Sequence, residues 1–80
     1  MAVVKEMHKL RVLLPHWTEH NAEHAAEFRD WAERAEASGH EDAARDISIA
    51  AEQLERANQT LVQALKKLGG ALEGHHTVGH

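Results

Sequence analysis

Residues 16–27 repeat a four-residue unit in which each histidine is followed three residues later by a glutamate. The histidines are His16, His20 and His24, and the last glutamate is Glu27. On an α-helix, side chains four residues apart lie one turn apart on one face, so neighbouring imidazoles can chelate one metal ion. His16 and His24 lie about 12 Å apart along an intact helix, too far to share an ion. The repeat therefore predicts one two-histidine site or two neighbouring sites.

The direction in which each side chain leaves the helix favours one cluster. With a turn of about 100° per residue, His24 falls within about 20° of the apolar seam of that helix and His20 about 60° to one side. His16 and Glu27 follow at about 80–100° to the same side. We therefore expect His20, His24 and Glu27 to bind a metal, with His16 as a supporting or alternative ligand. Two imidazoles and a carboxylate suit Zn or Ni best, with Co, Cu(II) and Fe as alternatives.

The same residues also have simpler interpretations. A histidine on an apolar helix face is usually a hydrogen-bonded core residue, and a glutamate three residues later is ordinary surface pairing. Asn21 and His24 both fall on the seam, where a buried polar residue can fix the register and oligomeric state of packed helices. The alternative function is therefore a helical dimerisation or adaptor module without metal.

Two long amphipathic helices are predicted to position the repeat. Apolar residues recur at alternating steps of four and three on both sides of Gly39, a pattern typical of helices that pack along a heptad seam. The first seam contains Val3, Met7, Leu10, Leu14, Trp17, Asn21, His24, Phe28, Trp31 and Ala35. The second contains Ile47, Ala50, Leu54, Ala57, Leu61, Ala64 and Leu68. The pattern predicts an antiparallel helical hairpin, an all-α fold, with Trp17, Phe28 and Trp31 in its core.

The boundaries follow from glycine and proline. The predicted ranges are 3–37 and 41–68 for the helices, 1–72 for the hairpin domain and 73–80 for a flexible His-rich tail. Gly39 follows a run of helix-forming residues and predicts the turn. Pro15 lacks a backbone N–H and predicts a kink in the first helix. Residues 3–14, taken alone, could also form a strand.

Of the five histidines outside the repeat, four form a weaker candidate site and one is a turn residue. If the hairpin pairs Trp31 with Ile47, the tail after Gly70 returns near the first eight residues. That weaker candidate contains His8, His75, His76 and His80. Histidine-rich tails are more often loose metal scavengers than defined sites. His40, in the predicted turn, is interpreted as a solvated loop residue.

The apolar residues are too small, and spread over too wide an arc, for an isolated hairpin. Hydrophobic residues make up 42% of the 80 residues, but 14 of them are Ala. There is no Cys, which excludes disulfides and thiolate metal ligands. A second apolar stripe lies beside the second seam, at Ile47, Ala51, Leu54, Val62 and Leu65. We therefore expect a homodimer that forms a four-helix bundle and completes the metal site.

Composition argues against several other classes. The net charge is −4 with neutral histidines, and no clustered basic face suggests nucleic acid binding. No uncharged stretch approaches the roughly 20 apolar residues of a membrane span, and no signal-peptide cleavage pattern is visible, so a cytoplasmic location is expected. No hydroxyl nucleophile has a visible histidine and carboxylate setting, so an enzyme is not expected. A small metal carrier, buffer or sensor, with a metalloprotein client as a further partner, is the predicted function.

The stretch from Leu13 to His24, followed by Phe28 and Trp31, resembles a small family of uncharacterised microbial helical-hairpin proteins. Those sequences have a similar L-P-H-W-x-x-H-N-x-x-H pattern and a Gly-His tail. The resemblance extends over nearly the whole chain and implies a helical hairpin in which the histidine array is a functional feature. It implies nothing about mechanism.

Overall fold

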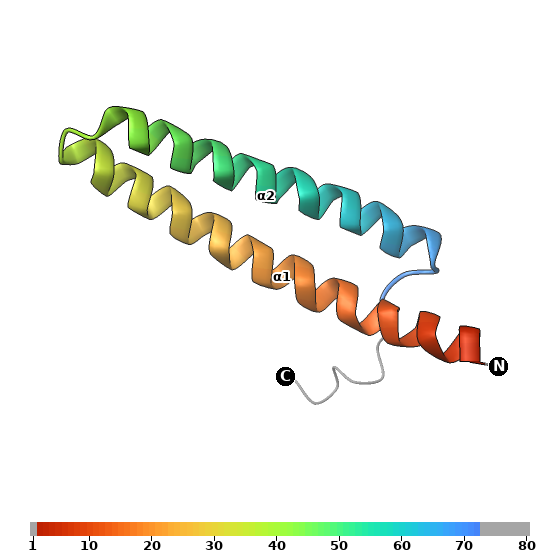
Figure 1. The fold of residues 1–80 in the computed structure, drawn as a ribbon. Helices are drawn as coiled ribbons and strands as arrows, with labels where there is room; N and C mark the ends of the chain where they lie inside the picture. Colours follow the sequence, from red (N-terminus) through yellow and green to blue (C-terminus); the bar gives the residue numbers. More distant parts are fainter. Residues whose placement is uncertain (1, 73–80) are drawn as a thin grey trace.

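A computed structural model describes residues 2–72, which form two long antiparallel helices joined by a short turn (Figure 1). Helix α1 spans Ala2–Ala37 and helix α2 spans Glu41–Lys67. The predicted all-α hairpin is confirmed, and each helix differs from its predicted range by one residue at one end. Residues 3–14 are helical, so the strand alternative is wrong. The predicted tail over residues 73–80 lies outside the described residues.

Both helices end in the same hydrogen-bonding pattern. At the end of α1, the His40 N–H donates to the Ala35 carbonyl at 2.9 Å and the Gly39 N–H to the Glu36 carbonyl at 3.0 Å. This is a Schellman motif, which needs a left-handed residue at Gly39, where φ is 88°. Gly69 and Gly70, with φ of 106° and 91°, end α2 with the equivalent bonds. Glycine therefore sets both chain reversals.

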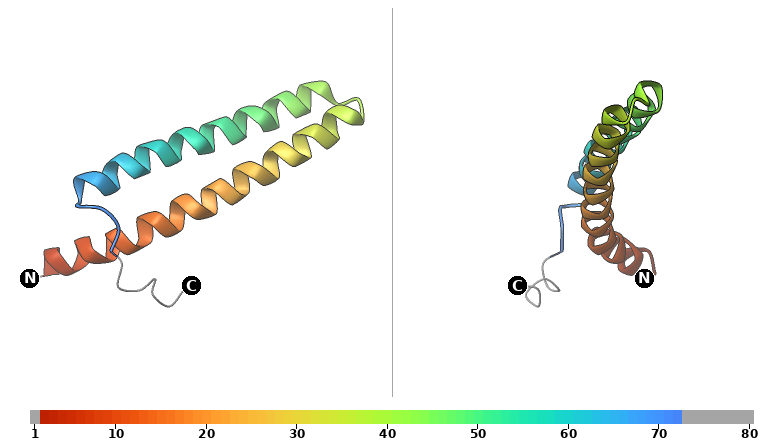
Figure 2. Two further views of the ribbon diagram at one scale, coloured as in Figure 1. Left: turned by 180° about the vertical axis from the view of Figure 1, so that it is seen from behind. Right: turned by 90° about the vertical axis from the view of Figure 1, so that its left-hand side faces the viewer.

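Pro15 lies inside α1 without ending it. Its missing N–H leaves the Arg11 carbonyl without its usual helical donor. The axis of α1 bends in the N-terminal part that contains Pro15, as the right-hand view of Figure 2 shows. The Thr18 hydroxyl donates to the Pro15 carbonyl at 3.0 Å. Helix α1 therefore continues through Pro15 with a bend, as the sequence predicts.

The contact between the helices is formed by small side chains. Among the described residues, the buried hydrophobic ones are Leu14, Ala25, Ala32, Ala44 and Ala51. Four of the five are alanines, which let two helix backbones approach closely. This Ala-rich seam is the whole buried core of residues 5–72, and it is thin for a domain of this size.

The prediction that the tryptophans lie in the core is wrong for the single chain. Trp17 is 41% exposed, Trp31 is 56% exposed and Phe28 is only partly buried. The intrachain contact uses Ala25 and Ala32, each one residue beyond the predicted seam position. The physical reason is size, because alanines permit a close approach that tryptophans at the same positions would prevent. Toward the turn, the predicted seam therefore borders the contact on one side, whereas Leu14, a seam residue nearer the open end, is buried as predicted.

Polar contacts fix the register of the helices. Asn21 Nδ2 donates to Asn58 Oδ1 at 3.0 Å, and Asn58 Nδ2 donates to the Thr18 carbonyl at 2.8 Å. Trp31 and Ile47 line one hollow, and Trp17 and Leu61 line another. The register that pairs Trp31 with Ile47 is therefore the one observed.

Arg11 fastens the open end of the hairpin. Its Nε donates to the Gly70 carbonyl at 2.6 Å and its Nη2 to the Gly69 carbonyl at 3.1 Å. A cation at this place also offsets the partial negative charge at the C-terminus of α2. Residues 11–37 of α1 therefore lie beside α2, and the N-terminal part of α1 extends past the C-terminal end of α2 (Figure 1).

Candidate metal centre

The Ala-rich seam separates two long faces of the hairpin. We call the first the apolar face; it contains Trp17, Phe28 and Trp31 of α1 with Ile47, Ala50 and Leu61 of α2. We call the second the charged face; it contains Arg29, Glu33, Glu36, Glu41 and Arg45. Residues seven apart in a helix lie on one side, so the two hollows that contain Trp17 and Trp31 belong to the same face. The histidine repeat borders the apolar face.

The three histidines form a column of rings along α1. The ring centroids of His16 and His20 lie 5.9 Å apart with an interplanar angle of 29°. Those of His20 and His24 lie 5.0 Å apart at 82°. His24 also lies beside Phe28, with centroids 6.4 Å apart. The predicted i, i+4 column is therefore present, and His16 and His20 line the same hollow as Trp17.

The spacing of His20 and His24 suits a shared metal ion. Two imidazoles on one tetrahedral Zn have ring centres about 5 Å apart, given Zn–N bonds of about 2.0–2.1 Å. The His20 and His24 rings already have this separation, so rotation about side-chain bonds is enough to direct one nitrogen of each toward an ion. His16 and His20 are farther apart and nearly parallel. The geometry thus favours His20 and His24, the pair predicted from the helix angles.

Glu27 lies on the far side of His24 from His20. Its Oε1 is 3.3 Å from His24 Nδ1, and the two side chains are 67% and 49% exposed. Residues 2–72 contain no group of three His, Cys, Asp or Glu side chains placed to hold one ion. Within one chain, the predicted cluster is therefore a two-histidine pair with a carboxylate hydrogen-bonded to one imidazole.

The sequence predicts His24 at the edge of the core between the two helices, and the structure does not place it there. It is half exposed because the contact with α2 is centred on Ala25 instead. His8 is exposed on α1, and His40 is exposed in the turn, as expected for a loop residue. The other members of the weaker terminal candidate, His75, His76 and His80, lie outside the described residues.

The partner of Asn21 was not predicted from the sequence. Asn58 lies opposite Asn21, and both amides are partly buried. The signal was available, since pairing Trp31 with Ile47 brings Asn21 and Asn58 close to one level. Arg11 was also missed, because its acceptors are backbone carbonyls of a turn, which no side-chain pattern reveals.

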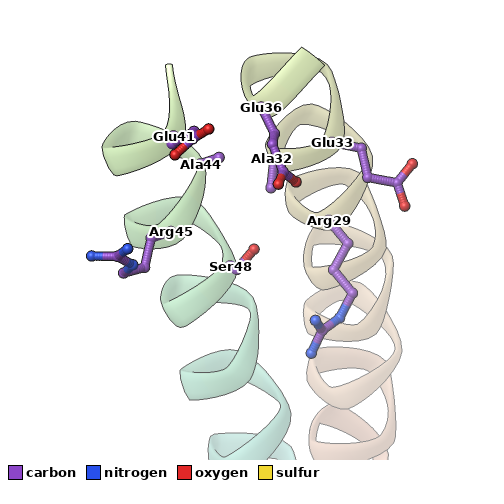
Figure 3. Close-up of a pocket in the computed structure, with 8 residues that line it drawn as sticks. All are labelled: Arg29, Ala32, Glu33, Glu36, Glu41, Ala44, Arg45 and Ser48. Atoms are coloured by element: carbon purple, nitrogen blue, oxygen red, sulfur yellow. The ribbon is translucent and has the colours of Figure 1, made fainter. Parts of the chain in front are cut away.

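The charged face contains a shallow hollow between the helices, shown in Figure 3. Glu33 and Arg45 point outward from their helices in that view, so the charged groups do not converge on one point. Beyond the hollow, Arg29 Nη2 lies 2.7 Å from Glu55 Oε1, and this hydrogen bond holds the pKa of the Glu55 carboxyl below its ordinary value. On this face, Arg29 is thus paired with a carboxylate of the other helix.

No helix among the described residues is both long and apolar enough to cross a membrane.

Residues 10–68 match the family model described as Domain of unknown function (DUF8180). The match includes the histidine repeat and the paired lengths of both helices. An uncharacterized protein of Archaeoglobus fulgidus is 36% identical over 63 residues, which cover 79% of this chain and all of that protein. No solved structure matches the chain. The protein is a helical hairpin that belongs to the DUF8180 family.

Proposed function

We propose that this protein binds a divalent transition metal ion through His20 and His24. The observation that carries the proposal is the 5.0 Å separation of their ring centroids, because it is the separation that two imidazoles have on a shared ion. His16 continues the column and is the alternative ligand, while Glu27 is the nearest carboxylate. Zn or Ni is the expected ion, and Co, Cu(II) and Fe are also compatible with imidazole and carboxylate ligands.

The exposure of the pair supports a role in holding and releasing metal. His20 and His24 are both exposed, and His24 has half of its side chain accessible. An ion bound there can exchange with solvent or with another protein. This property suits a metal carrier, buffer or sensor, and a carrier implies a metal-receiving protein as a partner.

We also propose that the protein is a homodimer, with two hairpins packed as a four-helix bundle. One leucine and four alanines are a small core for residues 5–72, while Trp17 and Trp31 remain exposed on the apolar face. The histidine pair supplies two of the four ligands of a tetrahedral ion. A second copy would cover the tryptophans and bring further ligands to the same place.

Metal titration of the tag-free chain tests the metal site. Isothermal titration with Zn and Ni should show a binding event that His20→Ala/His24→Ala weakens at least a hundredfold. The matched control is His8→Ala/His40→Ala, which removes two exposed histidines from outside the repeat and should leave the affinity unchanged. Metal at a hundred times its Kd should also stabilise the fold by about 2.7 kcal/mol. If the affinity is the same in both double variants, the proposed site is wrong.

A second candidate function is a dimerisation or adaptor module without metal, supported by the exposed Trp17 and Trp31 on the apolar face. In that case Asn21 sets the register and the histidines have no ligand. Asn21→Leu would then change the oligomeric state, and a chelator would not. Within residues 5–72, the hydrogen bond of the His24 side chain is to Glu27 on its own helix, which does not support a register role for His24.

A further inference from the structure

The apolar face is symmetric about its middle. Trp17, His24 and Trp31 follow one another at intervals of seven residues on α1. Leu61, Leu54 and Ile47 follow at the same interval in the reverse direction on α2. Trp17 shares a hollow with Leu61, and Trp31 shares one with Ile47, so His24 and Leu54 form the layer between them. The face therefore has a tryptophan layer at each end and a histidine layer at its centre.

This centre is also the centre of the hairpin. Arg11 marks one end of the paired length through its bonds to Gly69 and Gly70, and Ala37 marks the other end at the turn. His24 is the midpoint of residues 11–37. A two-fold axis through this layer, at right angles to the helices, would superimpose the whole length of the face of one chain on that of another.

We propose, as an extension of the proposed metal-binding function, that each metal ion is held jointly by two chains. The two-fold axis passes through the layer of His24 and Leu54. The two α1 helices run antiparallel on either side of this axis, and the apolar faces of the two chains cover each other. The ligands of one ion are His20 and His24 of one chain and Glu27 of the other. Two equivalent sites then lie on either side of the axis.

The partner's Glu27 is better placed than the chain's own. Within one chain, Glu27 lies about 7 Å along the helix axis beyond the midpoint of His20 and His24, and among the described residues these three side chains do not form a group that could hold one ion. The partner's α1 runs in the opposite direction. A residue three positions after His24 in the partner therefore comes level with the residue three positions before His24 in the first chain. The partner's Glu27 is therefore level with Asn21, between the two histidines of the pair.

The same arrangement covers the exposed aromatic residues. Each Trp17 comes level with the partner's Trp31, seven residues from the axis on opposite sides. These side chains are 41% and 56% exposed in the single chain. Two imidazoles and one carboxylate leave a fourth position open for a water or for the ligand of a receiving protein.

Complementation between two inactive chains tests this shared site. One variant is Glu27→Gln, which keeps both histidines, and the other is His20→Ala/His24→Ala, which keeps the carboxylate. Each homodimer should bind Zn at least tenfold more weakly than the natural sequence. The two chains are then refolded together, and the mixed dimer is isolated through a tag without histidine on one chain. It should regain about one high-affinity Zn site per dimer, since only this pairing joins the histidines to a carboxylate.

The outcomes separate this inference from the proposed function. If Glu27 acts on the histidines of its own chain, the mixed dimer contains no complete site and recovers nothing, which overturns the inference. A natural-sequence monomer that binds one Zn through His20 and His24 also overturns it and contradicts the proposed homodimer, while the proposed metal-binding function stands. A natural-sequence protein that binds no Zn contradicts both.

A cysteine cross-link tests the orientation without metal. The chain has no Cys, so Trp17→Cys and Trp31→Cys chains carry one thiol each. On mixing under mild oxidation, the disulfide between positions 17 and 31 should predominate. Predominant links between two copies of position 17, or two copies of position 31, would mean that the hairpins associate in parallel and would overturn the arrangement.

Discussion

The two faces of the hairpin are formed by the same helices but differ in how far one chain satisfies them. On the charged side, Arg29 pairs with Glu55 across the helices at 2.7 Å. On the apolar face, the tryptophans remain exposed and the histidine pair lacks further ligands. Arg34 lies over the Trp31 ring at 4.6 Å, which shields part of one tryptophan only. The apolar face is therefore the surface on which the proposed dimer contact and metal site would lie.

The largest expected effect is on self-association. Trp31→Glu places a charge on the apolar face, and losing the burial of one tryptophan per chain should raise the dimer Kd at least about a hundredfold. Glu33→Gln, on the charged face, is the matched control and should leave the Kd unchanged. Sedimentation velocity over a range of concentrations measures both. Equal effects of the two substitutions would show that the faces do not differ as proposed.

The next effect concerns the Ala-rich seam between the faces. Ala51 has no exposed surface, so Ala51→Leu should overpack the contact and lower the free energy of unfolding by about 1–3 kcal/mol. Ala50→Leu is the control, because the neighbouring alanine lines the hollow beside Trp31 and has room. Urea unfolding at matched concentrations compares them. If Ala50→Leu lowered the free energy of unfolding more than Ala51→Leu, the close contact between the helices would lie at Ala50 and not at Ala51.

A smaller effect is expected at the polar contact in the seam. Asn58→Ala removes the acceptor of Asn21 and the donor to the Thr18 carbonyl, which should lower the free energy of unfolding by about 1–2 kcal/mol. Gln59→Ala, at the exposed neighbouring position, should change it little. Urea unfolding measures both variants. Equal stability of the two would show that the amide pair does not hold the register.

The smallest effect is expected on the charged face. Arg29 lowers the pKa of Glu55, so their pairing stabilises the fold above the ordinary glutamate pKa and is lost as pH falls through the lowered value. Glu55→Gln should therefore reduce the melting temperature slightly at pH 7 and not at all at pH 2–3. High salt should reduce the difference at pH 7, because the pair is half exposed. An effect that persists at low pH would contradict the role of the ion pair.

The sequence predicts the hairpin well because apolar spacing and glycine position act locally. The steps of four and three indicate both helices, and Gly39 indicates the turn between them. The spacing does not predict that the contact with α2 is centred on Ala25, one residue beyond His24. Both residues lie near the apolar side of α1, so the spacing fits either of them. The choice between them depends on how closely two backbones can approach, which is a property of both helices together.

The candidate site was predictable in part for the same reason. The His20–His24 spacing is a property of one helix and appears in the structure as expected. The exposure of His24 was not predictable, because it follows from the offset of the seam. The Asn21–Asn58 bond was missed although the register that pairs Trp31 with Ile47 brings the two residues close to one level, because that register was not applied to the polar positions of the helices.

The place of Trp17 beside the histidine column also gives the molecule a built-in optical probe. The chain has two Trp and no Tyr, so its near-ultraviolet emission comes from Trp17 and Trp31 alone. Trp17 lines a hollow with His16 and His20, while Trp31 lies two turns beyond His24 beneath Arg34. Ions with unfilled d shells, such as Ni and Cu(II), quench nearby indole emission, and Zn does not. Fluorescence of the unmodified protein would therefore separate binding of a quenching ion, such as Ni or Cu(II), from binding of Zn at the proposed site.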